Sequence, residues 1–113
     1  MLTILPHIDV MNRLGRAMAD PSRARILLQL LKEPDSPARL AERLELTRSN
    51  VSNHLACLRG CGLVVAVPTG RHTQYEIADP HLAHAISALL EVVIAVDDGS
   101  PCLDNSCEVR GCC

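Results

Sequence analysis

The chain has 113 residues, which is enough for one domain with a modest core and too few for a second independent fold. Its only aromatic residue is Tyr75, so a core must be built from Leu, Ile, Val and Ala, which favours packed helices. The net charge is −2, but residues 1–75 hold ten Lys and Arg against six Asp and Glu, so the basic part is local, as a DNA-binding surface requires.

The N-terminal segment has neither the charged region nor the apolar run of a signal peptide, and no apolar stretch approaches the roughly 20 residues that span a bilayer. We therefore expect a cytoplasmic protein that does not contact the membrane. In that reducing compartment, six cysteines indicate metal ligands or redox groups rather than a disulfide framework. No phosphate loop, Cys-x-x-Cys motif or catalytic arrangement is recognisable, so we expect no enzymatic activity.

Helix starts are marked by an N-cap residue followed by Pro at the first helical position. The three pairs are Asp20-Pro21, Ser36-Pro37 and Asp79-Pro80. An earlier helix is predicted over about 10–19 by the spacing of its apolar residues. The helix that begins at Pro21 is expected to bury four side chains, Ile26, Leu27, Leu30 and Leu31.

A short helix, PARLAERL, follows Ser36, and the turn Glu45-Leu46-Thr47 connects it to a second helix that runs to about Gly62. A short helix, a tight turn and a second helix predict a helix-turn-helix. In the second helix the core-facing positions, spaced by three and four residues, are Val51, Leu55 and Leu58.

The segment after Gly62 predicts a β-hairpin, because LVVAV and TQYEIA flank the turn residues of PTGRH. The last helix, from Pro80 to about Val96, is apolar around nearly its whole circumference, and such a helix is normally buried. In so small a chain the simplest burial is against a second copy, so we expect a two-fold homodimer. The fold class is therefore mainly α with a small hairpin, a winged helix-turn-helix.

We expect two parts, a DNA-binding and dimerisation domain over 1–96 and a flexible, Cys-rich, metal-binding tail over 97–113. The second helix of the helix-turn-helix exposes hydroxyls and amides, whereas a face that is only solvated would more often carry Glu and Lys. The candidate DNA-contacting residues are Thr47, Arg48, Ser49, Ser52, Asn53 and His54, with Arg71 and His72 on the wing. Helices of this kind enter the major groove, and dimers read half-sites about one helical turn apart.

Two cysteines, Cys57 and Cys61, share one flank of the same helix, away from its core-facing side. A single buried Cys is commonly a small hydrophobe, but residues four apart have Cβ atoms ~5–6 Å from each other, which suits two thiolates that hold one ion. The helix C-terminus disfavours anions, and a bound cation removes that penalty.

The tail supplies further thiols, because two sulfurs do not complete a site. Cys102 is the first of them, after a connector over 97–101 that reaches some 15 Å at ~3.3 Å per residue. An all-sulfur site selects cadmium, lead, mercury, zinc or copper(I) over magnesium or calcium. Additional, less favoured ligands are Cys107, Cys112 and Cys113. The vicinal pair Cys112-Cys113 also suits arsenic(III) or mercury(II).

The chain resembles the ArsR/SmtB family of metal-sensing winged-helix repressors in LGRAMADPSRARILLQLL, LAERLELTRSNVSNHLACLRGCGLV and GRHTQYEIAD. Within the family it is most similar to the actinobacterial cadmium and lead sensors. The resemblance implies a homodimer that represses its own operon until Cd(II) or Pb(II) binds Cys57, Cys61 and Cys102, with the tail ligand coming from the partner subunit. Zn(II), Hg(II) and As(III) remain alternative inducers.

Two other metal sites of the family lack ligands in this sequence. Ser36 and Ala38 occupy the positions of a Cys-x-Cys motif at the start of the first helix of the helix-turn-helix. The family's zinc site between the paired final helices is represented here by Asp79 and His81. Asp79 also has an ordinary role as an N-cap. The positions of the later ligands of that site hold Val92 and Ala95. We expect neither site to bind metal.

We expect metal binding at the end of the DNA-reading helix to favour a geometry that cannot bind DNA, with a coupling of typically ~1–3 kcal/mol. Two alternatives stay open. A redox-sensing repressor of the same fold would form disulfides under oxidant, and a metal carrier that only buffers ions would not bind DNA in a sequence-specific way.

Overall fold

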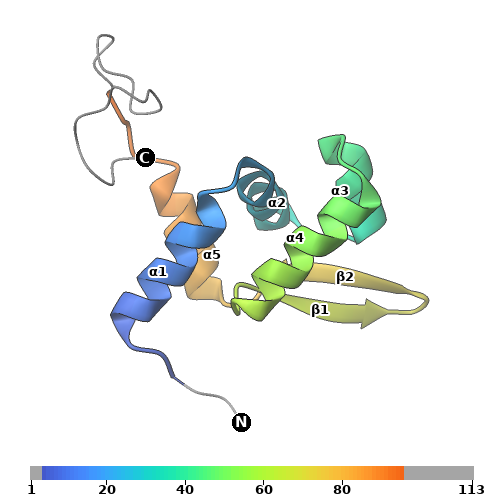
Figure 1. The fold of residues 1–113 in the computed structure, drawn as a ribbon, viewed down its shortest axis with the longest axis horizontal. Coiled ribbons are helices and arrows are strands. Elements are labelled where there is room, and N and C mark those ends of the chain that lie inside the picture. Colours follow the sequence, from blue (N-terminus) through green and yellow to red (C-terminus); the bar gives the residue numbers. More distant parts are fainter. Residues whose placement is uncertain (1–3, 96–113) are drawn as a thin grey trace.

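The computed structural model describes residues 4–95, which form five helices and one antiparallel β-hairpin (Figure 1). In chain order these elements are α1 (His7–Met18), α2 (Pro21–Lys32), α3 (Pro37–Leu44), α4 (Arg48–Gly60), β1 (Val64–Thr69), β2 (His72–Ile77) and α5 (Pro80–Leu89). The order confirms the predicted winged helix-turn-helix, in which α3 and α4 are the helix-turn-helix and the hairpin is the wing.

The predicted N-caps are confirmed at all three Pro-marked helix starts. The carboxylate of Asp20 accepts the backbone N–H of Arg23 at 2.9 Å, and the hydroxyl of Ser36 accepts that of Arg39 at 3.3 Å. Asp79 caps α5 in the same way. These bonds satisfy N–H groups that have no partner within the helix, so local sequence defines where α2, α3 and α5 begin.

The core lies between α2, α3, α4 and the start of β1. Its fully or almost fully buried apolar side chains are Ala17, Ile26, Leu27, Leu30, Leu40, Ala41, Val51, Leu55, Leu58, Leu63 and Val64. The predicted core-facing side of α4 is confirmed. Leu31 was predicted to be buried but is half-buried. At about 100° per residue it lies at the edge of the buried face of α2.

The turn between α3 and α4 is a Schellman motif built on a residue other than glycine. Glu45 has φ 56°, in the left-handed region. The backbone N–H of Leu46 donates to the carbonyl of Ala41 at 3.0 Å, and that of Glu45 donates to the carbonyl of Glu42 at 3.4 Å. The motif ends α3 abruptly and directs the chain into α4.

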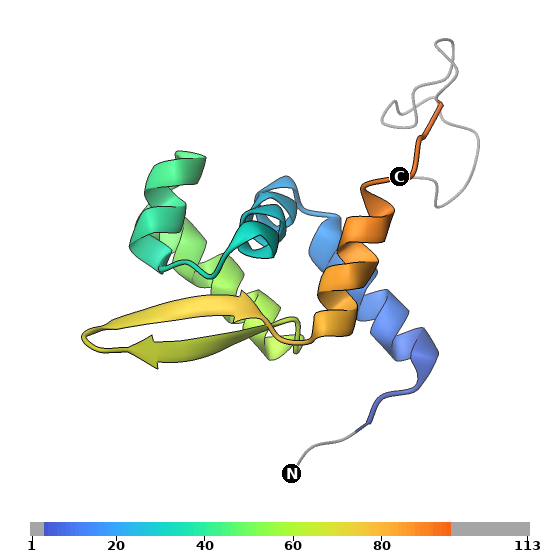
Figure 2. The same ribbon diagram turned by 180° about the vertical axis from the view of Figure 1, so that it is seen from behind.

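The wing is a regular hairpin, paired from Val64 with Ile77 to Thr69 with His72. Gly70, with φ 63°, takes the first position of its two-residue turn, where glycine has no steric penalty. Figure 2 shows the hairpin projecting from one end of the molecule. An isolated antiparallel bridge joins Asp35, in the loop between α2 and α3, to Tyr75 of β2. The middle of β2 is therefore attached to the loop that leads into the helix-turn-helix.

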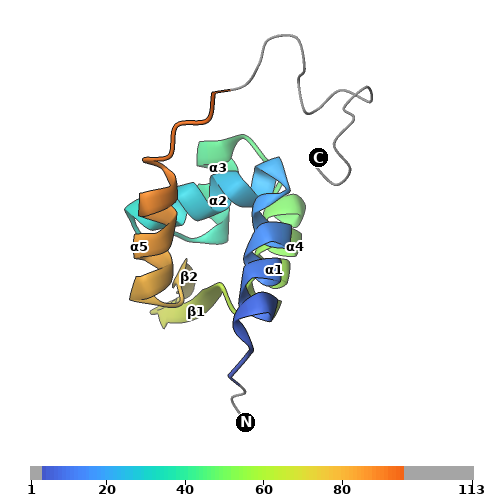
Figure 3. The same ribbon diagram turned by 90° about the vertical axis from the view of Figure 1, so that its left-hand side faces the viewer.

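The two terminal helices, α1 and α5, lie at the end of the molecule opposite the tip of the wing, and Figure 3 shows them separated from each other. A groove of about 340 Å³ is lined by residues of both helices. Large apolar side chains remain exposed on α1 and α5, including Met11 and Leu89. Among the described residues, no helix is long and apolar enough to cross a membrane.

The final helix is shorter than predicted. It ends at Leu89 rather than near Val96, and 92–95 have no regular secondary structure. The run Val92-Val93-Ile94 is β-branched, which lowers helix propensity. Within a single chain no packing offsets that cost, since Val93 is 90% and Ile94 79% exposed. The proposed boundary at 96, the connector and the cysteines of the tail lie outside the described residues.

The turn between α3 and α4 provides a test of the fold. Replacing Glu45 by Gly removes the steric cost of the left-handed conformation, and we expect the free energy of unfolding to rise by about 0.5–1 kcal/mol. The matched control Glu42→Gly lies inside α3 and should lower it by about 1 kcal/mol. Urea denaturation measures both. A fall in stability for Glu45→Gly would contradict the assigned turn.

Candidate metal centre and DNA-binding surface

Helix α4 presents two chemically different faces. Its apolar side is buried in the core, whereas its N-terminal half exposes a row of polar side chains, Arg48, Ser49, Ser52 and Asn53. The hydroxyl of Thr47 accepts the backbone N–H of Asn50 at 3.1 Å and lies 3.4 Å from the Ser49 hydroxyl. The start of α4 is thus a capped helix end with several exposed hydrogen-bonding groups.

His54 is positioned differently from the other candidate DNA contacts. Its side chain is 23% exposed, and its Nε2 lies 3.9 Å from the carboxylate of Asp20, the N-cap of α2. The pKa of Asp20 is lowered, mainly by the hydrogen bond from the Arg23 backbone and further by His54, against an opposing effect of desolvation. His54 therefore lies between α4 and the start of α2 and is less exposed than the other candidates.

The wing carries the remaining candidates at its turn. Arg71 and His72 are both exposed. The hydroxyl of Thr69 donates to the carbonyl of His72 at 3.4 Å, across the two-residue turn. The turn that carries Arg71 and His72 lies at the end of the hairpin far from α1 and α5 (Figure 1).

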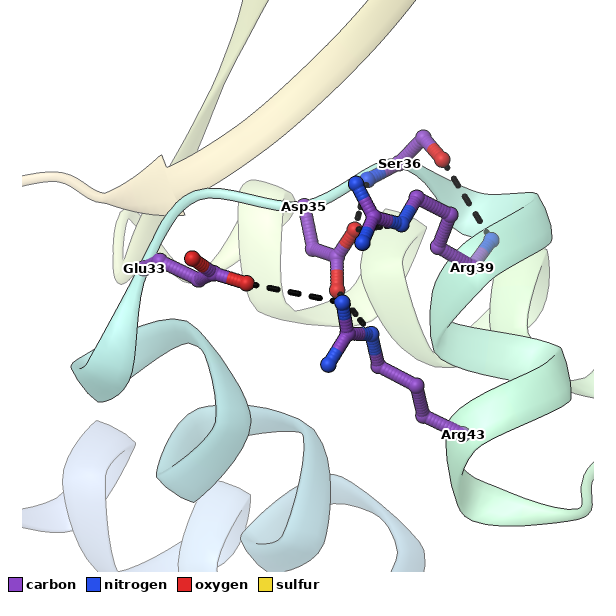
Figure 4. A network of polar contacts seen from close by, with 5 residues as sticks. All are labelled: Glu33, Asp35, Ser36, Arg39 and Arg43. Atoms are coloured by element: carbon purple, nitrogen blue, oxygen red, sulfur yellow. Dashed lines mark hydrogen bonds and ion pairs between the residues drawn. The ribbon is translucent and has the colours of Figure 1, made fainter.

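A buried carboxylate lies between the wing and the helix-turn-helix. Asp35 is 1% exposed, and its Oδ1 accepts the backbone N–H of Ser36 at 3.0 Å. Its Oδ1 lies 3.5 Å from Arg39 Nε and its Oδ2 lies 3.1 Å from Arg43 Nε (Figure 4). Arg43 also contacts Glu33 at 3.5 Å. The sequence analysis did not identify Asp35 as a structural residue, although Arg39 lies four positions later, a spacing typical of ion pairs on one side of a helix.

The two cysteines of α4 lie at its C-terminal end. Cys57 is exposed, and Cys61 is half-buried and directly follows the last helical residue, as the C-cap. The backbone N–H of Cys61 donates to the carbonyl of Cys57 at 3.0 Å. The two residues are therefore joined by the last hydrogen-bonded turn of the helix, which agrees with their predicted i, i+4 relation.

The backbone around Cys61 is fixed by a second Schellman motif. The N–H of Gly62 donates to the carbonyl of Arg59 and the N–H of Leu63 donates to that of Leu58, both at 3.0 Å. Gly62 has φ 83°, as the position after the C-cap requires. Leu58 and Leu63 are both buried, which gives the apolar contact typical of this motif.

Cys61 borders a groove of about 510 Å³ between the N-terminal segment, the end of α4 and the start of α5. Other residues that line it include Leu5, Arg13 and Asp79. A further ligand would therefore have space to approach this sulfur from outside the core.

The two thiols fit a soft metal ion but do not complete a site. Between residues 4 and 95, no group of three or more His, Cys, Asp or Glu residues is arranged to hold a metal. Structural metal sites commonly need about four ligands. The other predicted ligands, Cys102, Cys107, Cys112 and Cys113, lie outside the described residues.

The structure gives ordinary roles to the remnants of the other family sites. The carboxylate of Asp79 accepts the His81 backbone N–H at 2.6 Å and lies 3.1 Å from the ring Nδ1 of the same residue. The hydrogen bond from the His81 backbone is the main cause that lowers the pKa of Asp79. Asp79 is therefore confirmed as an N-cap, as Ser36 is in α3.

Comparisons with known proteins agree with the winged helix-turn-helix fold. Residues 20–65 match the family described as bacterial regulatory protein, arsR family. The chain is 56% identical over 103 residues to the HTH-type transcriptional regulator CmtR of Mycobacterium tuberculosis, which covers 91% of this chain and 87% of that protein.

Two solved structures are similar throughout the winged helix. The NMR structure of the cadmium metal-sensor CMTR from Mycobacterium tuberculosis matches with a TM-score of 0.65 and 58% identity, over 83% of this chain and 98% of that chain. The homodimeric winged helix-turn-helix DNA-binding domain of Mb0332 from Mycobacterium bovis matches with a TM-score of 0.69 and 26% identity, over 74% and 77%.

The turn that holds Cys61 can be tested with two glycines of different backbone conformation. Gly62→Ala meets no atom within 4 Å but forces alanine into a positive φ, so we expect the free energy of unfolding to fall by about 1–2 kcal/mol. Gly60→Ala adds the same methyl group inside the helix and should raise it by about 0.5–1 kcal/mol. Equal effects of the two changes in thermal unfolding would refute the assigned turn.

Proposed function

Because the chain belongs to the ArsR family of bacterial regulatory proteins, we propose that it is a metal-responsive transcriptional repressor. It binds operator DNA as a homodimer in the cytoplasm and is released when a soft metal ion binds. The observation that carries this proposal is the placement of Cys57 and Cys61 at the C-terminal end of the same helix that exposes polar side chains at its start. The proposed function involves no catalysis.

The N-terminal half of α4 enters the major groove and the wing contacts the DNA beside it. The residues in contact with DNA are Thr47, Arg48, Ser49, Ser52 and Asn53 of α4 and its cap, with Arg71 and His72 of the wing. Exposure of these side chains supports the assignment, because base edges and phosphates are read by exposed donors and acceptors. His54 belongs to the same proposed set, and its partly exposed side chain lies beside Asp20 at the start of α2.

The homodimer forms through α1, α5 and the residues that follow α5. Exposed apolar side chains on these elements include Ile8, Met11, Leu89, Leu90 and Val93. A monomer that exposes so many large apolar groups in one region loses much of the free energy of burial. The homodimeric state of the Mb0332 domain supports the same arrangement in this chain.

The metal is held by Cys57, Cys61 and Cys102, with Cys107, Cys112 and Cys113 as less favoured ligands. The similarity to a cadmium metal-sensor supports Cd(II) as the inducer, and Pb(II), Zn(II), Hg(II) and As(III) are alternatives compatible with thiolate ligands. When bound, the ion keeps the thiols deprotonated and supplies positive charge at the negative end of the α4 dipole.

Helix α4 transmits the signal because it carries both sites. The tail, once held at Cys57 and Cys61, restrains the end of the helix whose start contacts the bases. Metal and DNA then oppose each other through one rigid element, and each must weaken the binding of the other by the same factor.

Cadmium titration identifies the ligands. We expect the thiolate-to-cadmium charge-transfer absorbance to fall in Cys57→Ser, Cys61→Ser and Cys102→Ser, and after truncation at Pro101, because each change removes a sulfur donor. Cys112→Ser is the matched control in the tail and should keep the parent signal. Unchanged absorbance in both Cys57→Ser and Cys61→Ser would remove the end of α4 from the site.

Release from DNA is the direct test of the function. Saturating cadmium should lower the affinity for DNA upstream of the chain's own gene by about 5–150-fold, as measured by fluorescence anisotropy. The double variant Cys57→Ser/Cys61→Ser should bind the same DNA and ignore cadmium. Loss of binding with peroxide, restored by dithiothreitol and indifferent to metal, would instead support the redox-sensing alternative, which the exposed thiol of Cys57 permits.

A further inference from the structure

A hollow of about 260 Å³ lies where the start of α3, the start of α4 and the turn of the wing come together. The residues that line it include Ser36, Ala38, Arg48, Arg71, His72 and Thr73. It is distant in sequence from the cysteines and is lined mainly by polar and basic groups. Its position beside the exposed half of α4 places it on the surface that faces DNA in the proposed function.

The hollow exists because β2 is attached to the loop before α3. The backbone N–H of Asp35 donates to the carbonyl of Tyr75 at 3.1 Å, and the N–H of Tyr75 donates to the carbonyl of Asp35 at 2.8 Å. From Tyr75 the strand continues toward the turn through Thr73 and His72, past the first turn of α3. The wing is thus held beside the N-terminus of α3 at a fixed separation.

The arginines near this surface differ in whether they form an ion pair with Asp35. Its buried carboxylate holds Arg39 and Arg43 in ion pairs (Figure 4). Within residues 4–95, neither Arg48 nor Arg71 has an acidic partner within 4.0 Å. Two arginines without an acidic partner in this part of the chain therefore border the same hollow.

The first turn of α3 adds a backbone donor. Ser36 caps the N–H of Arg39, and Pro37 has no N–H. Ala38 is therefore the residue of this turn whose N–H has no hydrogen-bond partner among the described residues. A helix N-terminus favours anions through such donors and through its dipole.

We propose that this hollow binds one backbone phosphate of the operator duplex, held by Arg48, Arg71 and the backbone N–H of Ala38. The inference rests on the proposed function and deepens it, because it assigns Arg48 to the phosphate backbone rather than to the bases. A phosphate held between α4 and the wing fixes the distance between the two groups that enter the grooves. Contacts of this kind position a protein on DNA without reading sequence.

The test compares variants that lower the charge by one at different places. Arg48→Gln and Arg71→Gln remove a positive charge from the hollow, and Lys32→Gln removes one from the exposed C-terminal end of α2 as the control. Binding is measured over a range of salt concentrations to the DNA upstream of the gene and to a scrambled duplex of equal length. Arg48→Gln and Arg71→Gln should each reduce the slope of the logarithm of the binding constant against the logarithm of salt concentration by about 1. Each should also weaken binding to both duplexes by the same factor.

Ala38→Glu tests the hollow without removing any group. A carboxylate in the first turn of α3 is favourable for the helix, so the thermal midpoint and cadmium binding should match the parent. Its negative charge opposes a phosphate in the hollow, so affinity for both duplexes should fall, and should fall more than in Lys32→Gln.

Each outcome separates the inference from the proposed function. The phosphate site is overturned if Ala38→Glu keeps the affinity and salt slope of the parent protein. It is also overturned if Arg48→Gln loses affinity only for the upstream DNA. Neither result contradicts the proposed repressor function. If the parent protein does not prefer the upstream DNA to the scrambled duplex, the proposed function fails first and the inference fails with it.

Discussion

Burial of one side of α4 is the constraint on which the rest of this structure depends. Val51, Leu55 and Leu58 are almost completely removed from solvent, and each such side chain contributes about 1.5–3 kcal/mol relative to exposure. That free energy fixes the rotation of α4 about its axis. The polar side chains of its first half must then point outward, and the thiol-bearing flank must lie beside the N-terminal segment and the start of α5. One packed face therefore orients both candidate sites.

A second constraint is electrostatic and joins the wing to the helices. Asp35 is buried, and loss of one partner from a buried ion pair typically costs about 3–5 kcal/mol. Arg39 and Arg43 remain partly exposed, so solvent reduces the strength of these pairs. The backbone of the same residue pairs with Tyr75 of the wing. The position of the wing relative to α4 is thereby set by a short loop and not by the hairpin alone.

The proposed function uses the two ends of α4 for different chemistry. The positive end of the helix faces the polar, DNA-directed surface, and the negative end carries the sulfur atoms. A cation at one end and a polyanion at the other are each compatible with the helix dipole, so competition between them must come from geometry. The restraint supplied by the tail is the simplest source of that geometry, because the Schellman motif at Gly62 leaves the backbone of Cys61 little freedom.

The sequence alone determined the starts of α2, α3, α4 and α5, the core-facing side of α4, the hairpin, and the i, i+4 placement of Cys57 and Cys61 at the end of α4. These follow from caps, periodicity and turn residues that act over a few positions. Only the tertiary structure decided the burial of Asp35, the contact of His54 with Asp20 and the hollow beside the wing. It also ended α5 at Leu89, where local apolar character predicted a longer helix. Each of these depends on segments distant in the chain, whose packing no local pattern encodes.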